Sequence, residues 1–266
     1  LGINYEPPQW SFCKNCSHVF LNPRFSEKFE ERLYGKESIY RKISKQGKST
    51  SEYMLTIDNT INGKVKFHKT HYKTLKKVLK IIGSKRKLKI LDFGAGWGSC
   101  STSAEELGLD YRGLEIDNWC LGQAEKLNRN VKSTFDDFEN IDLLYSLQVF
   151  EHINDPRNVL EEFIYKMKIG SYIFTNVPTY EYDLTKNWSM GGLDSLNWFH
   201  SQSYSGNSLL YLFELYGFEK VKIWLDNGDV NVLVKKKSNK KIMSKLQKTS
   251  LFKKQMEFKL HIYVLV

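Results

Sequence analysis

The sequence predicts an α/β fold whose mostly parallel sheet ends in an antiparallel hairpin. Two observations support this prediction. Short apolar runs alternate with segments of helical period between about residues 65 and 217, which is typical of βαβ units. After the last helical segment, Asn227-Gly228 separates two runs of strand character, and Asn-Gly between such runs is the strongest short signal for a hairpin.

The individual elements follow from the apolar spacing and from signals at their ends. An amphipathic helix is expected over residues 65–82, because apolar side chains recur at helical spacing and Gly83 follows as a stop. Asp155 can cap a helix that begins with Pro156, a residue suited to the first helical position. The expected strands cover residues 88–93, 111–116, 131–135, 141–147 and 171–177, and the other helices cover residues 98–107, 118–128 and 209–216.

The composition limits the cellular compartment in which the protein is expected. No run reaches the roughly 18 apolar residues of a membrane span, and the first residues lack the pattern of a signal peptide. The four cysteines do not have the dense, even spacing of a secreted disulfide scaffold. We therefore expect a cytoplasmic protein. Because the sequence begins with Leu1, we also expect further residues upstream.

Positive charge is concentrated at the end of the chain. The net charge is +10, and the segment from Lys235 onward holds ten lysines and one acid, Glu257. The rest of the chain is nearly neutral, which argues against nucleic acid as its partner. We expect the basic amphipathic tail either to attach weakly to anionic membrane or to be a disordered solubilising segment.

A glycine-rich loop follows the first strand of the alternating pattern. Gly94, Gly96 and Gly98 let backbone amides approach a ligand closely, while Asp92 just before them suits a ligand with an ammonium group. Glu115 stands nineteen residues after Gly96, at the end of the next strand, where a carboxylate can accept both hydroxyls of a ribose. A nucleoside that bears an amino acid satisfies both acids, and that ligand is S-adenosylmethionine.

The motifs resemble those of class I S-adenosylmethionine-dependent methyltransferases, in the branch that methylates small molecules. The similarity covers Ile90 to Gly98, Gly113 to Asp117, and "SLQVFEHINDP" from Ser146 to Pro156, and extends more loosely to the last strand. It implies a Rossmann-like sheet of seven strands with helices on both faces. It also implies three segments: a CxxC-containing segment over residues 1–50, a methyltransferase domain over residues 51–237 and the basic tail over residues 238–266.

The resemblance also implies the cofactor-binding residues. An acid after the third strand usually meets the adenine amino group, and either Asp136 or Asp137 could do so, although both could equally belong to a solvated loop. Gln148 follows the fourth strand, at the edge where open α/β sheets bind ligands, although it could equally be a packing residue. The full set of expected cofactor-binding residues is Asp92, Gly94, Ala95, Gly96, Glu115, Ile116, Asp136, Asp137 and Gln148.

Two histidines are candidates for proton removal from an acceptor hydroxyl. His152 lies between the fourth strand and the helix that begins at Pro156, and a histidine with a pKa near 6.5 suits a general base at neutral pH. The alternative is that His152 only hydrogen-bonds backbone and shapes its loop. His200, from the aromatic-rich segment 179–202, is the other candidate base. Glu151 could orient the His152 ring or contact the cofactor.

A CxxC motif near the start supplies half of a tetrahedral zinc site. Cys13 and Cys16 would need two more ligands, and His18 is a candidate third. Related methyltransferases often carry an upstream CxxC, so the missing pair could precede Leu1, and zinc is expected only if it does. In the sequence as given we expect an empty or partial site.

The expected function is methyl transfer to a small polar acceptor. A hydroxyl or carbon of a sugar or a lipid-linked glycan is favoured, only because such acceptors are common in the family. One alternative is an RNA methyltransferase that uses the basic tail to hold nucleic acid. The other is a non-catalytic module that binds the cofactor without turnover.

Overall fold

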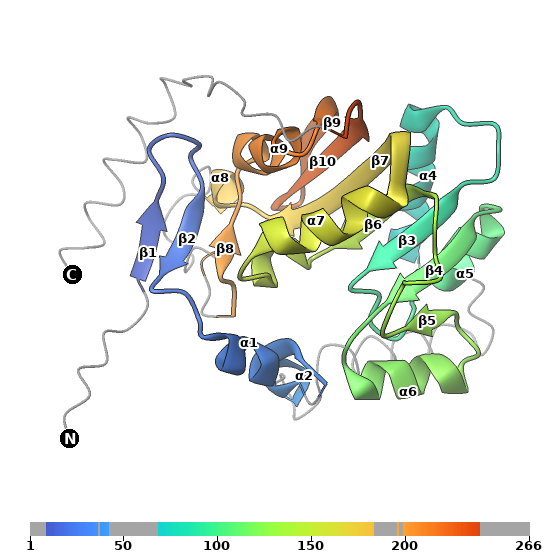
Figure 1. Ribbon diagram of the computed structural model, residues 1–266, viewed down its shortest axis with the longest axis horizontal. Helices are drawn as coiled ribbons and strands as arrows, with labels where there is room; N and C mark the ends of the chain where they lie inside the picture. Colours follow the sequence, from blue (N-terminus) through green and yellow to red (C-terminus); the bar gives the residue numbers. More distant parts are fainter. Residues whose placement is uncertain (1–8, 37, 43–68, 184–195, 197–198, 240–266) are drawn as a thin grey trace.

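The computed structural model describes residues 9–36, 38–42, 69–183, 196 and 199–239. A seven-stranded sheet with the order β5-β4-β3-β6-β7-β10-β9 forms its centre (Figure 1). Its first five strands pair in parallel, and β10 runs antiparallel to both β7 and β9. The strands are β3 (Lys89–Phe93), β4 (Asp110–Leu114), β5 (Val131–Lys132), β6 (Ile141–Leu147), β7 (Met167–Pro178), β9 (Phe218–Asp226) and β10 (Asp229–Lys236). The predicted α/β fold and its final hairpin are confirmed.

Helices cover both faces of this sheet. On one face, α4 (Lys69–Ile82) and α5 (Ser101–Glu106) bury apolar side chains against β3 and β6. On the other, α7 (Pro156–Lys166) and α9 (Gly206–Glu214) pack on β6, β7 and β10. The helix α6 (Asn118–Lys126) connects β4 to β5. The predicted cap of α7 is confirmed, because the Asp155 carboxylate accepts a hydrogen bond of 3.1 Å from the Arg157 amide.

Several elements differ in their bounds from the sequence prediction, and three of these differences have a clear physical reason. The strand expected over residues 131–135 is the two-residue edge strand β5, which pairs only with Gly113 and Leu114 of β4. The strand expected from residue 171 begins at Met167, and its pairing with β6 shifts register between Ile141 and Leu143. The helix α9 begins at Gly206, because Ser205 caps it in a capping box.

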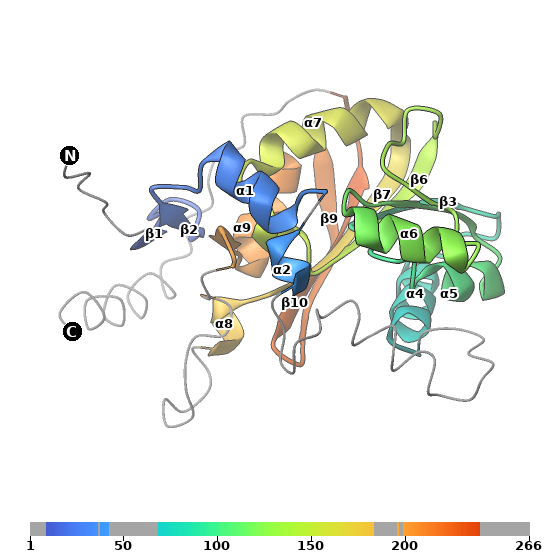
Figure 2. The same cartoon turned by 90° about the horizontal axis from the view of Figure 1, so that it is seen from below.

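The N-terminal part adds a second, smaller sheet and two short helices. β1 (Gln9–Phe12) and β2 (Val19–Asn22) form a hairpin, and β2 also pairs with β8 (Gln202–Ser203). They are followed by α1 (Glu27–Tyr34) and α2 (Ile39–Lys42), which lie between the small sheet and α6 (Figure 2). The division into segments 1–50, 51–237 and 238–266 stays a prediction.

Two other predicted segments fall largely or wholly outside the described residues. Of the aromatic-rich stretch 179–202, the structure describes α8 (Tyr180–Asp183), residue 196 and residues 199–202, which lead into β8. The basic tail is described only to residue 239, so its attachment to membrane is untested. In the part of the chain that is described, no helix is both long enough and apolar enough to cross a membrane.

The hairpin turn gives a first test of the fold. Gly228 has a φ of +97°, and an added Cβ would lie 3.3 Å from Tyr182 Cδ1. We expect Gly228→Ala to lower the free energy of unfolding by about 1–3 kcal/mol, the usual range for such backbone strain. Gly122 inside α6 is the matched control, since a Cβ there meets nothing within 4 Å. Gly122→Ala should raise stability by about 0.5–1 kcal/mol, and urea unfolding measures both.

Candidate active site

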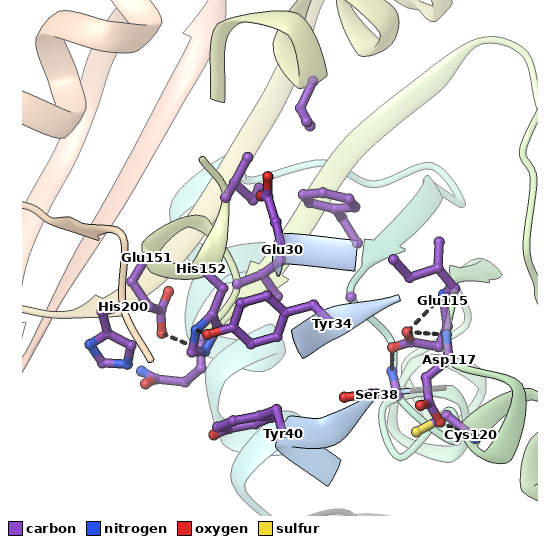
Figure 3. A pocket seen from close by; sticks show the side chains of 18 of the residues that line it. Glu30, Tyr34, Ser38, Tyr40, Glu115, Asp117, Cys120, Glu151, His152 and His200 are labelled. Atoms are coloured by element: carbon purple, nitrogen blue, oxygen red, sulfur yellow. Dashed lines mark hydrogen bonds and ion pairs between the residues drawn. The ribbon is translucent and has the colours of Figure 1, made fainter. Parts of the chain in front are cut away.

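A cavity of about 1020 Å³ lies at the carboxyl ends of β3, β4 and β6. Parallel α/β sheets bind ligands at this edge. Residues after these three strands form one part of the lining, and residues of α1, α2 and the segment between them form another. In Figure 3, Glu115, Asp117 and Cys120 lie on one side, Glu151, His152 and His200 lie on the other, and Tyr34 and Tyr40 lie between the two groups.

The glycine loop after β3 opens toward this cavity. Gly94 has a φ of +72°, and an added Cβ would lie 2.3 Å from Val149 Cγ2, so no larger residue fits there. Gly96 also has a positive φ, but a Cβ on it would meet no atom within 4 Å. Gly94 and Gly96 both line the cavity. The loop therefore leaves open space beside the strand end, as close approach by a ligand requires.

The carboxylate of Glu115 fixes this loop from the neighbouring strand. Its Oε2 accepts a hydrogen bond of 2.9 Å from the Gly96 amide, and its Oε1 accepts bonds from the amides of Ile116 and Asp117 at 2.7 and 2.9 Å. Burial raises the pKa of Glu115, and these amide donors oppose the rise. Glu115 lines the cavity at the end of β4, where the sequence places the acid that would accept ribose hydroxyls.

Asp92 lies behind the loop and not on the cavity wall. Its side chain is buried, and its Oδ2 accepts a hydrogen bond of 2.9 Å from the Tyr111 hydroxyl. Burial raises the pKa of Asp92 to about 7. A ligand ammonium group would favour its charged form, whether it met the carboxylate directly or through water.

Two of the other predicted cofactor residues line the cavity. Gln148 has a φ of +56°, rare for a residue other than glycine. It is held there by Asn176, whose carbonyl and side-chain oxygens accept bonds of 2.8 and 2.7 Å from the Gln148 amide and Nε2. Ile116 also lines the cavity, whereas Ala95 is buried in the loop and is not part of the lining.

The two adenine candidates lie outside the lining. Asp137 is exposed and forms an ion pair of 2.7 Å with Arg112, which lowers the pKa of the Asp137 carboxyl to about 2. The backbone carbonyl of Asp136 accepts a hydrogen bond of 2.8 Å from Lys166. That one of these acids meets adenine stays a prediction, and the choice between them stays open.

The structure brings the two candidate bases together. His152 and His200 have ring centroids 4.8 Å apart, and Glu151 Oε1 lies 3.9 Å from His152 Nε2 (Figure 3). All three residues line the cavity. Burial and the neighbouring His200 lower the pKa of His152 to about 3, well below the ordinary value on which the sequence argument relied. The His152 ring is therefore neutral at physiological pH.

Several lining residues were not predicted from the sequence. They lie on α1, on α2 and in the short segment between them, and the main ones are Glu30, Tyr34, Ser38 and Tyr40. The Tyr34 hydroxyl donates to the Phe199 carbonyl and lies 3.0 Å from His152 Nδ1. The only local signal is the spacing of Glu27, Glu30, Glu31 and Tyr34, which places them on one face of a helix.

The CxxC cysteines lie away from this cavity. Cys13 and Cys16 lie in the turn between β1 and β2 and form no disulfide, and burial raises the pKa of Cys16 to about 11. The ring of His18 makes a hydrogen bond of 2.5 Å with the Gln202 side chain. A zinc site at these residues stays a prediction.

The comparison with protein families decides the identity. A family described as a methyltransferase domain matches residues 67–223, more than half of the chain. The chain belongs to this family. It is a class I methyltransferase domain, and S-adenosylmethionine is its cofactor.

Individual relatives agree with this assignment. A ubiquinone biosynthesis O-methyltransferase from Paraburkholderia phymatum is 28% identical over 98 residues, which are 32% of this chain and 42% of that protein. The match thus spans less than half of the relative's length. The structure of the plantazolicin methyltransferase BpumL in complex with SAH has a TM-score of 0.51 at 14% identity and covers 70% of this chain and 90% of that one. An S-adenosylmethionine-dependent methyltransferase from Clostridium acetobutylicum has a TM-score of 0.50 at 11% identity, covering 70% and 98%. At these identities the structural likeness shows the fold.

The methyltransferase cavity fits S-adenosylmethionine at its glycine-loop end, where Gly96 leaves open space and Glu115 offers carboxylate oxygens. We expect Glu115→Ala to weaken binding of S-adenosylmethionine by at least about tenfold, because two charge-assisted hydrogen bonds to the ribose would be lost. Titration calorimetry measures this. Glu105→Ala, on the exposed side of α5, is the control that should bind normally. Unchanged affinity in a folded Glu115→Ala protein would contradict the assignment.

Asp92 gives a prediction about pH. Its pKa is about 7 in the fold and about 3.9 in an unfolded chain, so the native state binds more protons between these values. Stability should therefore fall as pH rises from 4 to 7. Asp92→Asn removes this contribution. As pH rises from 4 to 8, the free energy of unfolding of the variant should therefore increase relative to that of the wild type, by up to roughly 4 kcal/mol. Urea unfolding at several pH values tests this, and parallel curves for both proteins would contradict it.

Proposed function

We propose that this methyltransferase transfers a methyl group to a hydroxyl of a small polar acceptor. The observation that carries the proposal is that one cavity has two chemically different ends. Gly96 and Glu115 mark the cofactor end, while Glu151, His152 and Tyr34 mark an end suited to a polar acceptor. A common cavity supports direct transfer between two bound molecules.

Methyl transfer requires little of the protein beyond alignment of the methyl donor with the acceptor. S-adenosylmethionine supplies a methyl group on a positively charged sulfur, and its transfer is an in-line displacement favoured by proximity and orientation. The acceptor hydroxyl must also lose its proton. His152, whose ring is neutral, and His200 line the wall where such a hydroxyl would lie, which supports proton removal at this end of the cavity.

The charges of the lining bear on the acceptor class. Among the described lining residues there are seven carboxylic acids and no lysine or arginine. The acids are Glu27, Glu30, Glu31, Glu115, Asp117, Glu151 and Asp229. Such a wall disfavours a phosphate inside the cavity, since phosphate recognition relies on Arg, Lys or amide donors. The part of the acceptor that enters is therefore uncharged or cationic, as in a sugar or the glycan part of a lipid-linked molecule.

Oxygen is the favoured methylated atom. The relative from Paraburkholderia phymatum is named as an O-methyltransferase, which supports a hydroxyl over a carbon. An RNA acceptor receives no support from the acidic wall. Binding of RNA that weakens steeply with salt would favour the RNA alternative, and cofactor binding without turnover on any acceptor would favour a non-catalytic module.

The proposal predicts a separation of turnover from cofactor binding. Radiolabelled methyl transfer should be screened over sugars, nucleotide sugars, lipid-linked glycans and RNA. With the acceptor found, His152→Ala should lower turnover by about 10²- to 10⁴-fold, the usual contribution of a group that assists proton transfer, with little change in cofactor affinity. His200→Ala tests the other ring. If both variants keep most of their turnover, neither histidine takes part.

A further inference from the structure

Three side chains at the acceptor end converge on one point of the cavity wall. One ligand atom each from Glu151, His152 and His200 lies within 4.8 Å of the other two. Glu151 and His152 come from the 3₁₀ turn Phe150–His152 after β6, and His200 precedes β8. The cluster therefore joins segments about 50 residues apart in the chain.

The Glu151 carboxylate has no partner that explains its burial. Its side chain is 1% exposed, and neither oxygen accepts a hydrogen bond from another described residue. A buried carboxylate without a partner is costly, and such groups are normally paired or coordinate a metal. Among the residues that the structure describes, Glu151 makes one ionic contact, with His152 Nε2 at 3.9 Å, which is too long for a hydrogen bond.

The His152 ring is held with a lone pair directed to the cluster. Its Nδ1 lies 3.3 Å from the Phe199 carbonyl, which can only accept, and 3.0 Å from the Tyr34 oxygen. Tyr34 gives its own proton to the same carbonyl, so Nδ1 of His152 carries the ring proton. The lone pair is then on Nε2, the nitrogen nearest Glu151. Histidine ligands of metals are fixed in this way, by a hydrogen bond from their other nitrogen.

We infer that Glu151, His152 and His200 bind a divalent cation of the first transition series, such as Mn²⁺, Co²⁺ or Zn²⁺. Two imidazole nitrogens and one carboxylate oxygen suit these ions. With ligand bonds near 2.0–2.2 Å, two donors on one ion lie about 3–4 Å apart, close to the separation of Glu151 and His152. The ion would neutralise the buried carboxylate and leave positions open toward the cavity, where an acceptor oxygen could bind.

The cation site is inferred from this geometry alone, whereas its role in activating the acceptor hydroxyl rests on the proposed function. A bound cation lowers the pKa of a hydroxyl that reaches it. The proton leaves to water, an oxygen lone pair forms the bond to the methyl carbon, and the electron pair of the carbon–sulfur bond stays on sulfur. His152 would then act as a ligand and not as the base, because its Nε2 lone pair is engaged.

Co²⁺ is a suitable probe, because its binding can be measured both by calorimetry and by its visible absorption. Cys13 and Cys16 could bind the same ion, so the experiment uses the full chain with Cys13→Ser and Cys16→Ser after treatment with a chelator. We expect one Co²⁺ per chain without thiolate absorption. Glu151→Gln and His200→Ala should each weaken binding more than about tenfold, since loss of an outer partner alone costs about 10- to 100-fold.

Thermal unfolding separates ligand loss from misfolding. Co²⁺ should raise the Tm of the serine background but not that of the same protein with Glu151→Gln. Glu30→Gln makes the same chemical change in the same cavity, on a carboxylate that already accepts a 2.8 Å bond from the Asn154 amide, and it should bind Co²⁺ normally. Absence of saturable binding, or full affinity in both Glu151→Gln and His200→Ala, would overturn the site.

The outcome does not depend on turnover. Methyl transfer that persists in chelator, together with no ion binding, rejects the metal site and leaves the proposed function intact. Ion binding without methyl transfer to any acceptor supports the site and rejects the function.

Discussion

The carboxylate of Glu115 is the constraint on which the cofactor end depends. It joins the loop after β3 to the turn after β4 by accepting three backbone amides. Without it, Gly96 and the amides of the β4 turn would need other partners beside the cavity, where unpaired donors are costly. A single acid thus fixes the shape of the glycine loop and presents oxygens to the ligand.

Local signals in the sequence were sufficient for the order of the main elements and for the glycine loop. The glycine loop, the Asp155 cap and the Asn227-Gly228 turn each follow from a few adjacent residues, and the structure places each where the pattern predicts. The length of β5 was not predictable, because an edge strand of two residues is set by the backbone groups of β4 that are available for pairing. At the other end, Glu151, His152 and His200 were named from the sequence, but the lining residues of α1 and α2 were missed, since contacts such as Tyr34 with Phe199 join residues 165 positions apart.

Burial without a full set of partners distinguishes Asp92 and Glu151 from Asp142. Asp142 is also buried, but Arg86 and the Lys89 amide supply three donors to its carboxylate. The Asp92 carboxylate accepts one hydrogen bond, from the Tyr111 hydroxyl, and the Glu151 carboxylate accepts none from another described residue. Their pKa values rise to about 7 and about 8 through burial. Both lie in or just after central strands at the cavity, where a positively charged ligand would compensate them.

The two ends of the cavity are therefore built by different parts of the chain. The loops after β3 and β4 supply the cofactor end, whereas α1, α2 and the segment between them share the rest of the wall with the loop after β6 and the β9–β10 turn. Hydrogen bonds hold the α1 and α2 part of the wall in place. They join Glu30 to Asn154, Tyr34 to His152 and Phe199, and Lys36 to Asn118. Because these bonds reach the loop after β6 and the start of α6, we propose that changes in the N-terminal helices would alter the end of the cavity that holds Glu151 and His152. The bond from the Gly96 amide to Glu115 involves neither helix, so acceptor choice would vary while cofactor binding is kept.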